Sequence, residues 1–210
     1  MASAVRSRTI SLAWGREPGS GGLSRTWFRH LRGDARCGEP EAGGRGPEAL
    51  KTPIVVDIAD LRVTDDPGVE LVTYALGSCI GLSIWDPVAR VGGLLHYMLP
   101  NSALSPLKAR TTPAMFADTG IPLLFKAAYE LGAVKQRLIA KVAGGAAMFE
   151  TSDVMDVGKH NYLMLRKLLW RNGVMIAGEH VGDSTNRTMR LDVATGRTTV
   201  ENRQWGCIEI

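Results

Sequence analysis

A cysteine and a histidine in the first half of the chain are residue types that nucleophilic chemistry requires. Cys79 ends the stretch Thr73-Tyr-Ala-Leu-Gly-Ser-Cys79, and His96 follows seventeen residues later. Two neighbouring strands joined by a tight turn at Asp86-Pro-Val-Ala89 would bring the two side chains toward each other. Because an imidazole can take the proton of a thiol, the pair predicts nucleophilic attack on a carbonyl carbon.

The residues around Cys79 favour this role. Gly77 and Ser78 directly before it permit a sharp turn that exposes the sulfur and aims backbone N–H groups at a bound carbonyl. Thr73 lies on the strand that enters the turn, where either its hydroxyl or its carbonyl could orient the imidazole of His96. The alternative is an inert cysteine packed in the core, which is common for a cysteine in apolar surroundings.

The expected reaction is that of a cysteine hydrolase. His96 takes the proton of Cys79, which leaves a thiolate–imidazolium pair at neutral pH. The thiolate attacks an amide carbon, and backbone donors near Ser78 and Cys79 hold the oxyanion. His96 then protonates the departing amine, and water releases the acyl group. The spacing of these residues does not identify the substrate.

Hydrophobic periodicity predicts many short strands and two helices, which favours an α/β or α+β fold with a mixed sheet covered by helices. The helices are expected over about 114–131 and 158–171, with a polar loop over 101–112. The predicted strands span residues 54–58, 69–74, 80–85, 91–96, 136–142, 174–177, 188–193 and 197–201.

Composition divides the chain into an extension over residues 1–50 and a folded domain over 51–210. The extension has eight arginines against five acids, nine glycines and no sustained apolar period, so we expect it to be disordered and dispensable for folding and activity. The remainder is almost neutral, which argues against nucleic-acid binding. Three cysteines without paired spacing, no secretory signal and no apolar run of about 20 residues predict a reduced, cytoplasmic protein that does not span a membrane.

Several motifs in order resemble the CheD family, the chemoreceptor glutamine deamidases of bacterial chemotaxis. The resemblance covers about residues 53–201 and is carried by Leu76-Gly-Ser-Cys79, His96-Tyr-Met-Leu-Pro100 and Lys141-Val-Ala-Gly-Gly-Ala-Ala-Met-Phe149. It implies a layered α/β sandwich and a Cys–His–Thr triad that hydrolyses glutamine side chains in the cytoplasmic helices of methyl-accepting chemoreceptors. By motif position, Cys79 is the nucleophile, His96 the base and Thr73 the orienting residue.

The resemblance also implies a partner in some members, the phosphatase CheC, which acts on a phosphorylated response regulator. This sequence departs from the commoner pattern at Ala75, where glycine is frequent, and at Gly182-Asp-Ser184, where a glycine pair is usual. A non-catalytic adaptor that binds receptors or such a phosphatase is the alternative function. The intact Thr73, Cys79 and His96 favour the enzyme.

A glycine pair, Gly144-Gly145, follows the predicted strand 136–142. It lacks the Gly-Lys-Ser/Thr ending of a phosphate-binding loop, so we expect a tight turn that lines the glutamine pocket. His160 and His180 have no partners at metal-ligand spacing, and the sequence predicts neither a metal nor a cofactor.

Overall fold

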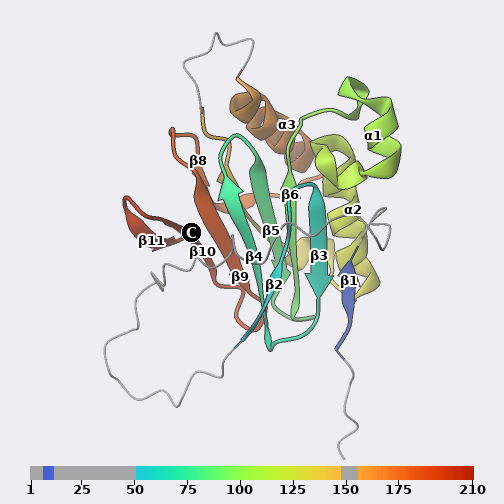
Figure 1. Cartoon of the computed structure of the whole chain (residues 1–210). Coiled ribbons are helices and arrows are strands. Elements are labelled where there is room, and N and C mark those ends of the chain that lie inside the picture. Colours follow the sequence, from blue (N-terminus) through green and yellow to red (C-terminus); the bar gives the residue numbers. More distant parts are fainter. Residues whose placement is uncertain (1–6, 12–50, 148–155) are drawn as a thin grey trace, which may run out of the picture.

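Two β-sheets pack face to face, and helices cover the outer face of one of them, in a computed structural model that describes residues 7–11, 51–147 and 156–210 (Figure 1). The first sheet has the order β1-β3-β6-β5-β7-β8. Its strands are β1 Thr9–Ser11, β3 Asp60–Thr64, β5 Ile80–Asp86, β6 Val91–Tyr97, β7 Ile139–Gly144 and β8 Ile176–Val181. The helices are α1 Pro106–Thr111, α2 Ala117–Glu130 and α3 Val157–Arg171.

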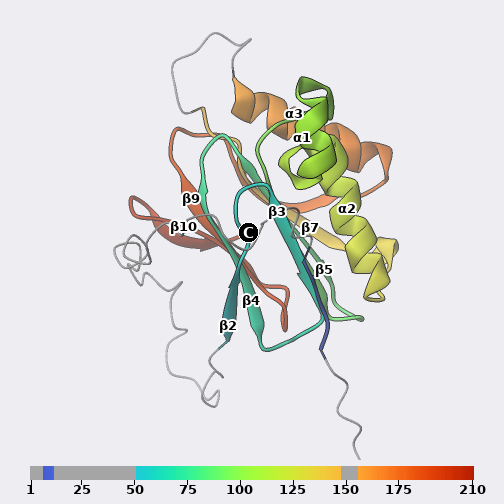
Figure 2. The same cartoon turned by 45° about the vertical axis from the view of Figure 1, so that its right-hand side comes forward.

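The second sheet has the order β11-β10-β9-β4-β2. Its strands are β2 Thr52–Val55, β4 Val69–Leu76, β9 Arg187–Asp192, β10 Thr198–Asn202 and β11 Gly206–Glu209. The turned view shows this sheet on one side of the first sheet and helices α2 and α3 on the other (Figure 2). The layers are therefore sheet, sheet and helices.

The central strands β5 and β6 are buried on both faces, because alternate side chains serve two separate cores. Leu95 and Tyr97 of β6 pack with α2 and α3 in one core, whereas Leu94 packs against the second sheet in the other. This explains why β5 and β6 read as nearly continuous apolar runs rather than as alternating ones.

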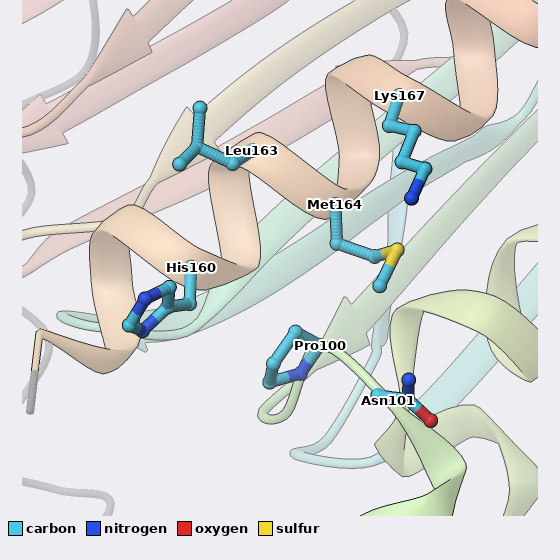
Figure 3. Close-up of a pocket in the computed structure, with 6 residues that line it drawn as sticks. All are labelled: Pro100, Asn101, His160, Leu163, Met164 and Lys167. Atoms are coloured by element: carbon cyan, nitrogen blue, oxygen red, sulfur yellow. The ribbon is translucent and has the colours of Figure 1, made fainter. Parts of the chain in front are cut away.

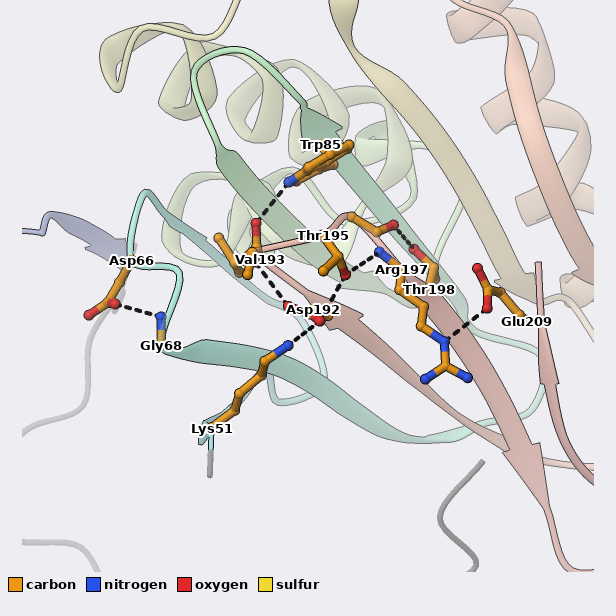
Figure 4. Close-up of polar contacts among 12 residues, drawn as sticks. Lys51, Asp66, Gly68, Trp85, Asp192, Val193, Thr195, Arg197, Thr198 and Glu209 are labelled. Carbon is orange, nitrogen blue, oxygen red and sulfur yellow. Dashed lines mark hydrogen bonds and ion pairs between the residues drawn. The ribbon is translucent and has the colours of Figure 1, made fainter. Parts of the chain in front are cut away.

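A tryptophan joins the two sheets at the end of β5. Trp85 donates its indole Nε1–H to the carbonyl of Val193, which directly follows β9, over 2.9 Å (Figure 4). Its ring packs on Gly196, where a Cβ atom would lie 2.2 Å from Trp85 Cε3. Only glycine fits this approach, and the residue also has a φ of +73°. Lys51, which precedes β2, pairs with Asp192 beside this turn.

A buried aspartate fixes the turn between β5 and β6. Asp86 accepts hydrogen bonds from the amides of Val88, Ala89 and Val134 and from the guanidinium of Arg137. Burial alone would raise the pKa of Asp86, but these donors outweigh it and lower the pKa to about 2. The carboxylate therefore stays charged at neutral pH and holds the hairpin that places β6 beside β5.

The predicted layered fold is confirmed and belongs to the α+β class, with most predicted strands and both helices present near their expected positions. The separation of the strands into two sheets was not predicted. The pattern also missed β3 and β11, and α1 lies in the segment that was expected to be a loop.

The N-terminal extension is described only in part. Residues 9–11 form β1, an edge strand that pairs with β3, where Thr9 lies opposite Thr64. The rest of residues 1–50 lies outside the described residues, so the domain boundary at residue 51 stays a prediction. Cys79, which the structure describes, is a free thiol.

Candidate active site

A hydrogen bond between the two sheets joins two of the predicted site residues. Thr73 lies on β4 of the second sheet and His96 on β6 of the first, and the distance from Thr73 Oγ1 to His96 Nδ1 is 2.7 Å. Both side chains are completely buried. The geometry decides between the two groups of Thr73 considered from the sequence: the hydroxyl contacts the imidazole.

The hydrogen-bond pattern also fixes the tautomer of His96. The single hydroxyl proton of Thr73 is donated to the carbonyl of Val56 over 2.7 Å, so Thr73 Oγ1 must accept the proton carried by His96 Nδ1. The Nε2 atom of the neutral ring is then an unprotonated acceptor. This atom is buried without a hydrogen-bond partner among the described residues. The ring therefore presents a free base.

Cys79 lies at the diagonal position from His96 on the paired strand. Gly81 of β5 is directly opposite His96, and Cys79 precedes Gly81 by two residues. Residues two apart on a strand point to the same face, which here is the face toward the second sheet. A Cβ atom on Gly81 would meet Leu76 and Met189 of that sheet, which identifies the face. Cys79 itself is half-buried.

Burial shifts the pKa values of the pair toward their neutral forms. Desolvation lowers the pKa of His96 to about 4, although the negative charge of Asp57 opposes the shift. Desolvation also raises the pKa of the Cys79 thiol, against a hydrogen bond from its own backbone amide. The free protein therefore holds a thiol and a neutral imidazole at pH 7. The expected thiolate–imidazolium pair is not the favoured resting state.

The Gly144–Gly145 pair lies against the loop that carries Cys79. Gly145 donates its amide to the carbonyl of Cys79, and Ala146 donates to the carbonyl of Gly77, both over 2.8 Å. A Cβ atom on Gly144 would lie 2.1 Å from the Cys79 carbonyl oxygen, and Gly144 has a φ of +111°. Because the Gly145 amide already donates to the Cys79 carbonyl, it is not free for an oxyanion, and the pair holds the loop in place.

The candidate oxyanion donors are reduced to two amides. The Gly77 amide donates to the carbonyl of Ala75, which has a φ of +57° at the bulge in β4. Among the described residues, the amides of Ser78 and Cys79 have no backbone acceptor. These two N–H groups are therefore the candidate oxyanion donors, and the Cys79 N–H also lies against its own sulfur.

Two contacts of the site were not predicted from the sequence. One is the carbonyl of Val56, which no side-chain pattern can reveal. The other is Asn161 on α3, a fully buried amide whose Nδ2 donates to the carbonyls of Ser78 and Met98. A single polar residue on the buried face of an amphipathic helix was the only signal for Asn161.

A shallow apolar pocket lies where α3 meets the segment after β6 (Figure 3). At about 270 Å³ it is smaller than a typical site for a drug-sized ligand. Among the described residues, no cluster of His, Cys, Asp and Glu could hold a metal ion. The residues that line the pocket are Pro100, Asn101, His160, Leu163, Met164 and Lys167.

Comparison with known proteins finds one family model and many relatives. Residues 98–202 match the family described as CheD chemotactic sensory transduction. A Syntrophus aciditrophicus protein named probable chemoreceptor glutamine deamidase CheD 1 is 54% identical over 149 residues, 71% of this chain and 93% of that protein. A Solibacter usitatus protein named probable chemoreceptor glutamine deamidase CheD is 55% identical over 144 residues, 69% of this chain and 85% of that protein.

Among solved structures, a Neisseria meningitidis protein of the family model DUF152 covers 70% of this chain and 73% of its own. Its identity is 14% and its TM-score 0.42, too low to support an argument. Within the described residues, no helix is long and apolar enough to cross a membrane. The family-model match starts after Thr73, Cys79 and His96, so their roles depend on the geometry above.

We expect Gly144→Ala to disrupt the Cys79 loop, because the added Cβ atom overlaps the Cys79 carbonyl. Gly132→Ala is the matched control: Gly132 also has a positive φ, +96°, but a Cβ atom there meets nothing within 4 Å. Both variants carry backbone strain of about 1 kcal/mol. Thermal melting and the rate of Cys79 alkylation by iodoacetamide should change more in Gly144→Ala, and equal changes in the two variants would contradict the proposed support.

Replacing Thr73 by valine keeps the shape of the side chain but removes the acceptor for His96 Nδ1–H. We expect activity on an amide substrate to fall on the order of tenfold to a hundredfold, because the tautomer with a free Nε2 is no longer selected. Thr73→Ser retains the hydroxyl and should stay within about threefold of the parent rate. The measurement is the single-turnover rate of each variant and of the parent protein on the same amide substrate. Equal rates in the valine and serine variants would exclude the hydroxyl as the orienting group.

Proposed function

The chain belongs to the CheD family, and from that premise we propose that it is a protein-glutamine deamidase of chemoreceptors. It hydrolyses side-chain amides of glutamine to glutamate and releases ammonia, using Cys79 as nucleophile, His96 as base and Thr73 as orienting residue. The observation that carries this proposal is the free Nε2 of a neutral, buried imidazole on the strand paired with the Cys79 strand. The names of the 54% and 55% identical relatives support the substrate class.

The neutral resting pair supports general-base activation of the thiol. As Cys79 Sγ attacks the glutamine Cδ atom, its proton passes to His96 Nε2, and Thr73 stabilises the ring through Nδ1. The amides of Ser78 and Cys79 hold the resulting oxyanion. His96 then gives the proton to the departing nitrogen, which leaves as ammonia. A water molecule, deprotonated by His96, attacks the thioester and releases glutamate and the thiol.

The charges of helices α1 and α3 support a protein substrate. Helices α1 and α3 contain six lysine and arginine residues and no acidic residue. Such a face would attract a partner with acidic side chains, such as a helix of a receptor, and the attraction would weaken with salt. The cytoplasmic helices of methyl-accepting chemoreceptors are the proposed substrate. A CheC-type phosphatase and a cytoplasmic location enter the proposal through family membership.

A non-catalytic adaptor is the less favoured function. An adaptor has no need for a buried histidine held in one tautomer, and burying an unpartnered Nε2 costs about 1–3 kcal/mol. Retaining such a group is explained by a reaction that uses it.

We expect Cys79→Ala and Cys79→Ser to abolish deamidation, with a rate loss on the order of 10³ or more. Intact-mass analysis of a receptor cytoplasmic fragment measures this, since replacing NH₂ by OH adds about one mass unit per event. Met175→Ala, at an 85% exposed position away from the site, is the control and should keep the parent rate. An active Cys79→Ala protein would rule out this nucleophile, and a silent parent protein would rule out the deamidase.

The low pKa of His96 predicts an unusual acid limit for activity. The base must be neutral, and with a pKa of about 4 it remains neutral well below pH 6.5, so kcat/KM should fall only as the pH approaches about 4. The unfolded chain, with an ordinary histidine pKa near 6.5, takes up this proton first, so stability falls between pH 6.5 and 4. Circular dichroism at each pH controls for unfolding. A fall in kcat/KM centred at about pH 6.5, while the protein is still folded, would contradict the buried neutral base.

A further inference from the structure

We infer that Asn161 is a positioning residue, which sets the orientation of the Ser78–Cys79 peptide and thereby aims the Cys79 amide at the oxyanion. This inference rests on the proposed deamidase function. Asn161 lies on the first turns of α3, far from the nucleophile in the sequence but in direct contact with its loop. It is completely buried.

The side-chain amide of Asn161 connects the nucleophile loop to the histidine strand. Its Nδ2 donates one proton to the carbonyl of Ser78 over 3.0 Å and the other to the carbonyl of Met98 over 2.7 Å. The reverse orientation would place Oδ1 against two carbonyl oxygens, so the network fixes this one. Ser78 precedes the nucleophile by one residue, and Met98 follows His96 by two. One side chain therefore holds the ends of both catalytic segments.

Peptide planarity transmits this contact to the reacting atoms. The carbonyl of Ser78 and the amide of Cys79 belong to one planar, trans peptide unit, in which the C=O and N–H bonds point in opposite directions. When Asn161 holds the carbonyl toward α3, the Cys79 N–H must point away from α3. The orientation of this oxyanion donor is therefore fixed before substrate binds, which is the condition for electrostatic stabilisation of a transition state.

Two further features hold Asn161 and its helix in place. Tyr97, the neighbour of His96, donates its hydroxyl to the backbone carbonyl of Asn161 over 2.8 Å. Burial, and next the proximity of Cys79, raises the pKa of Tyr97, so this hydroxyl stays protonated. One turn earlier, Gly158 lets α3 approach the glycine loop, since a Cβ atom there would lie 2.6 Å from the Ala146 carbonyl oxygen. The helix is thus fixed relative to both segments that Asn161 joins.

The test compares two reactions of Cys79 that differ in their need for an oxyanion donor. Deamidation forms a tetrahedral oxyanion, whereas alkylation by iodoacetamide is a displacement at a saturated carbon and forms none. In Asn161→Ala we expect kcat for a receptor fragment to fall on the order of 10²-fold, the size reported for weakened oxyanion holes, with KM within about twofold. The alkylation rate should stay within about threefold of the parent.

Asn172→Ala is the matched control on the same helix. Asn172 Nδ2 donates to the carbonyl of Leu168 at the other end of α3, far along the helix from the site. Its removal loosens the helix without touching the Cys79 loop, and both reaction rates should match the parent. Asn161→Ser keeps a single donor, is the variant to use if Asn161→Ala does not fold, and should have an intermediate kcat.

An independent measurement separates this inference from the proposed function. In ¹⁵N–¹H spectra of Asn161→Ser, the amides of Cys79 and Leu99, which follow the two carbonyls that Asn161 contacts, should shift, whereas Asn172→Ala should leave them unchanged. Unshifted amides, or equal losses of deamidation and alkylation, would overturn the positioning role. A parent protein that releases no ammonia would contradict the proposed function. The spectra would still show whether Asn161 fixes the orientation of the Ser78–Cys79 peptide.

Discussion

The hydrogen bond from His96 Nδ1 to Thr73 Oγ1 is the interaction on which the rest of the site depends. It crosses from one sheet to the other, and both side chains are fully buried. Because Thr73 gives its only proton to the Val56 carbonyl, the direction of the bond is determined and Nε2 is left free. A change in the distance between β4 and β6 would break this hydrogen bond, and the tautomer of His96 would no longer be fixed. The two-sheet architecture is therefore part of the chemistry, since a single sheet would not place a hydroxyl above the face of the histidine strand.

Glycines and an asparagine extend this control from the base to the nucleophile. Gly144 lets β7 come close enough for the amides that follow it to bind the loop carbonyls of Cys79 and Gly77. Asn161 binds the one carbonyl between them, that of Ser78. Three consecutive carbonyls of the loop are thus held by hydrogen bonds, and the proposed mechanism uses the amides of Ser78 and Cys79 toward the substrate. Buried backbone groups must find partners, and here that requirement also orients the loop.

The sequence indicated the candidate site residues more directly than the arrangement of the strands in two sheets. Types and spacing suggested Cys79 and His96 as a pair, because strand pairing brings residues of adjacent β-strands together in a simple way. Thr73 reaches His96 from the other sheet, a contact that strand pairing alone does not predict. The second sheet could not be predicted, since the strands that face each other across a sandwich have no spacing rule. Strand β3 was missed because it is short and only two of its five residues, Leu61 and Val63, are apolar. Pro106 at the first position of α1 was an available helix signal that a polar, loop-like composition concealed.

The sequence predicted the resting protonation state of Cys79 and His96 poorly, because the pKa of each group depends on its burial in the fold. A cysteine next to a histidine suggests an ion pair, yet desolvation favours the neutral forms of both groups here. A thiolate held in advance reacts with any electrophile that reaches it, whereas a neutral thiol reacts where a base, an oxyanion donor and an amide carbon are aligned together. Keeping the thiol neutral therefore makes reactivity depend on the positioned donors around Cys79. For an enzyme that must choose particular glutamines on a protein surface, selectivity then comes from geometry at the loop rather than from the intrinsic reactivity of the sulfur.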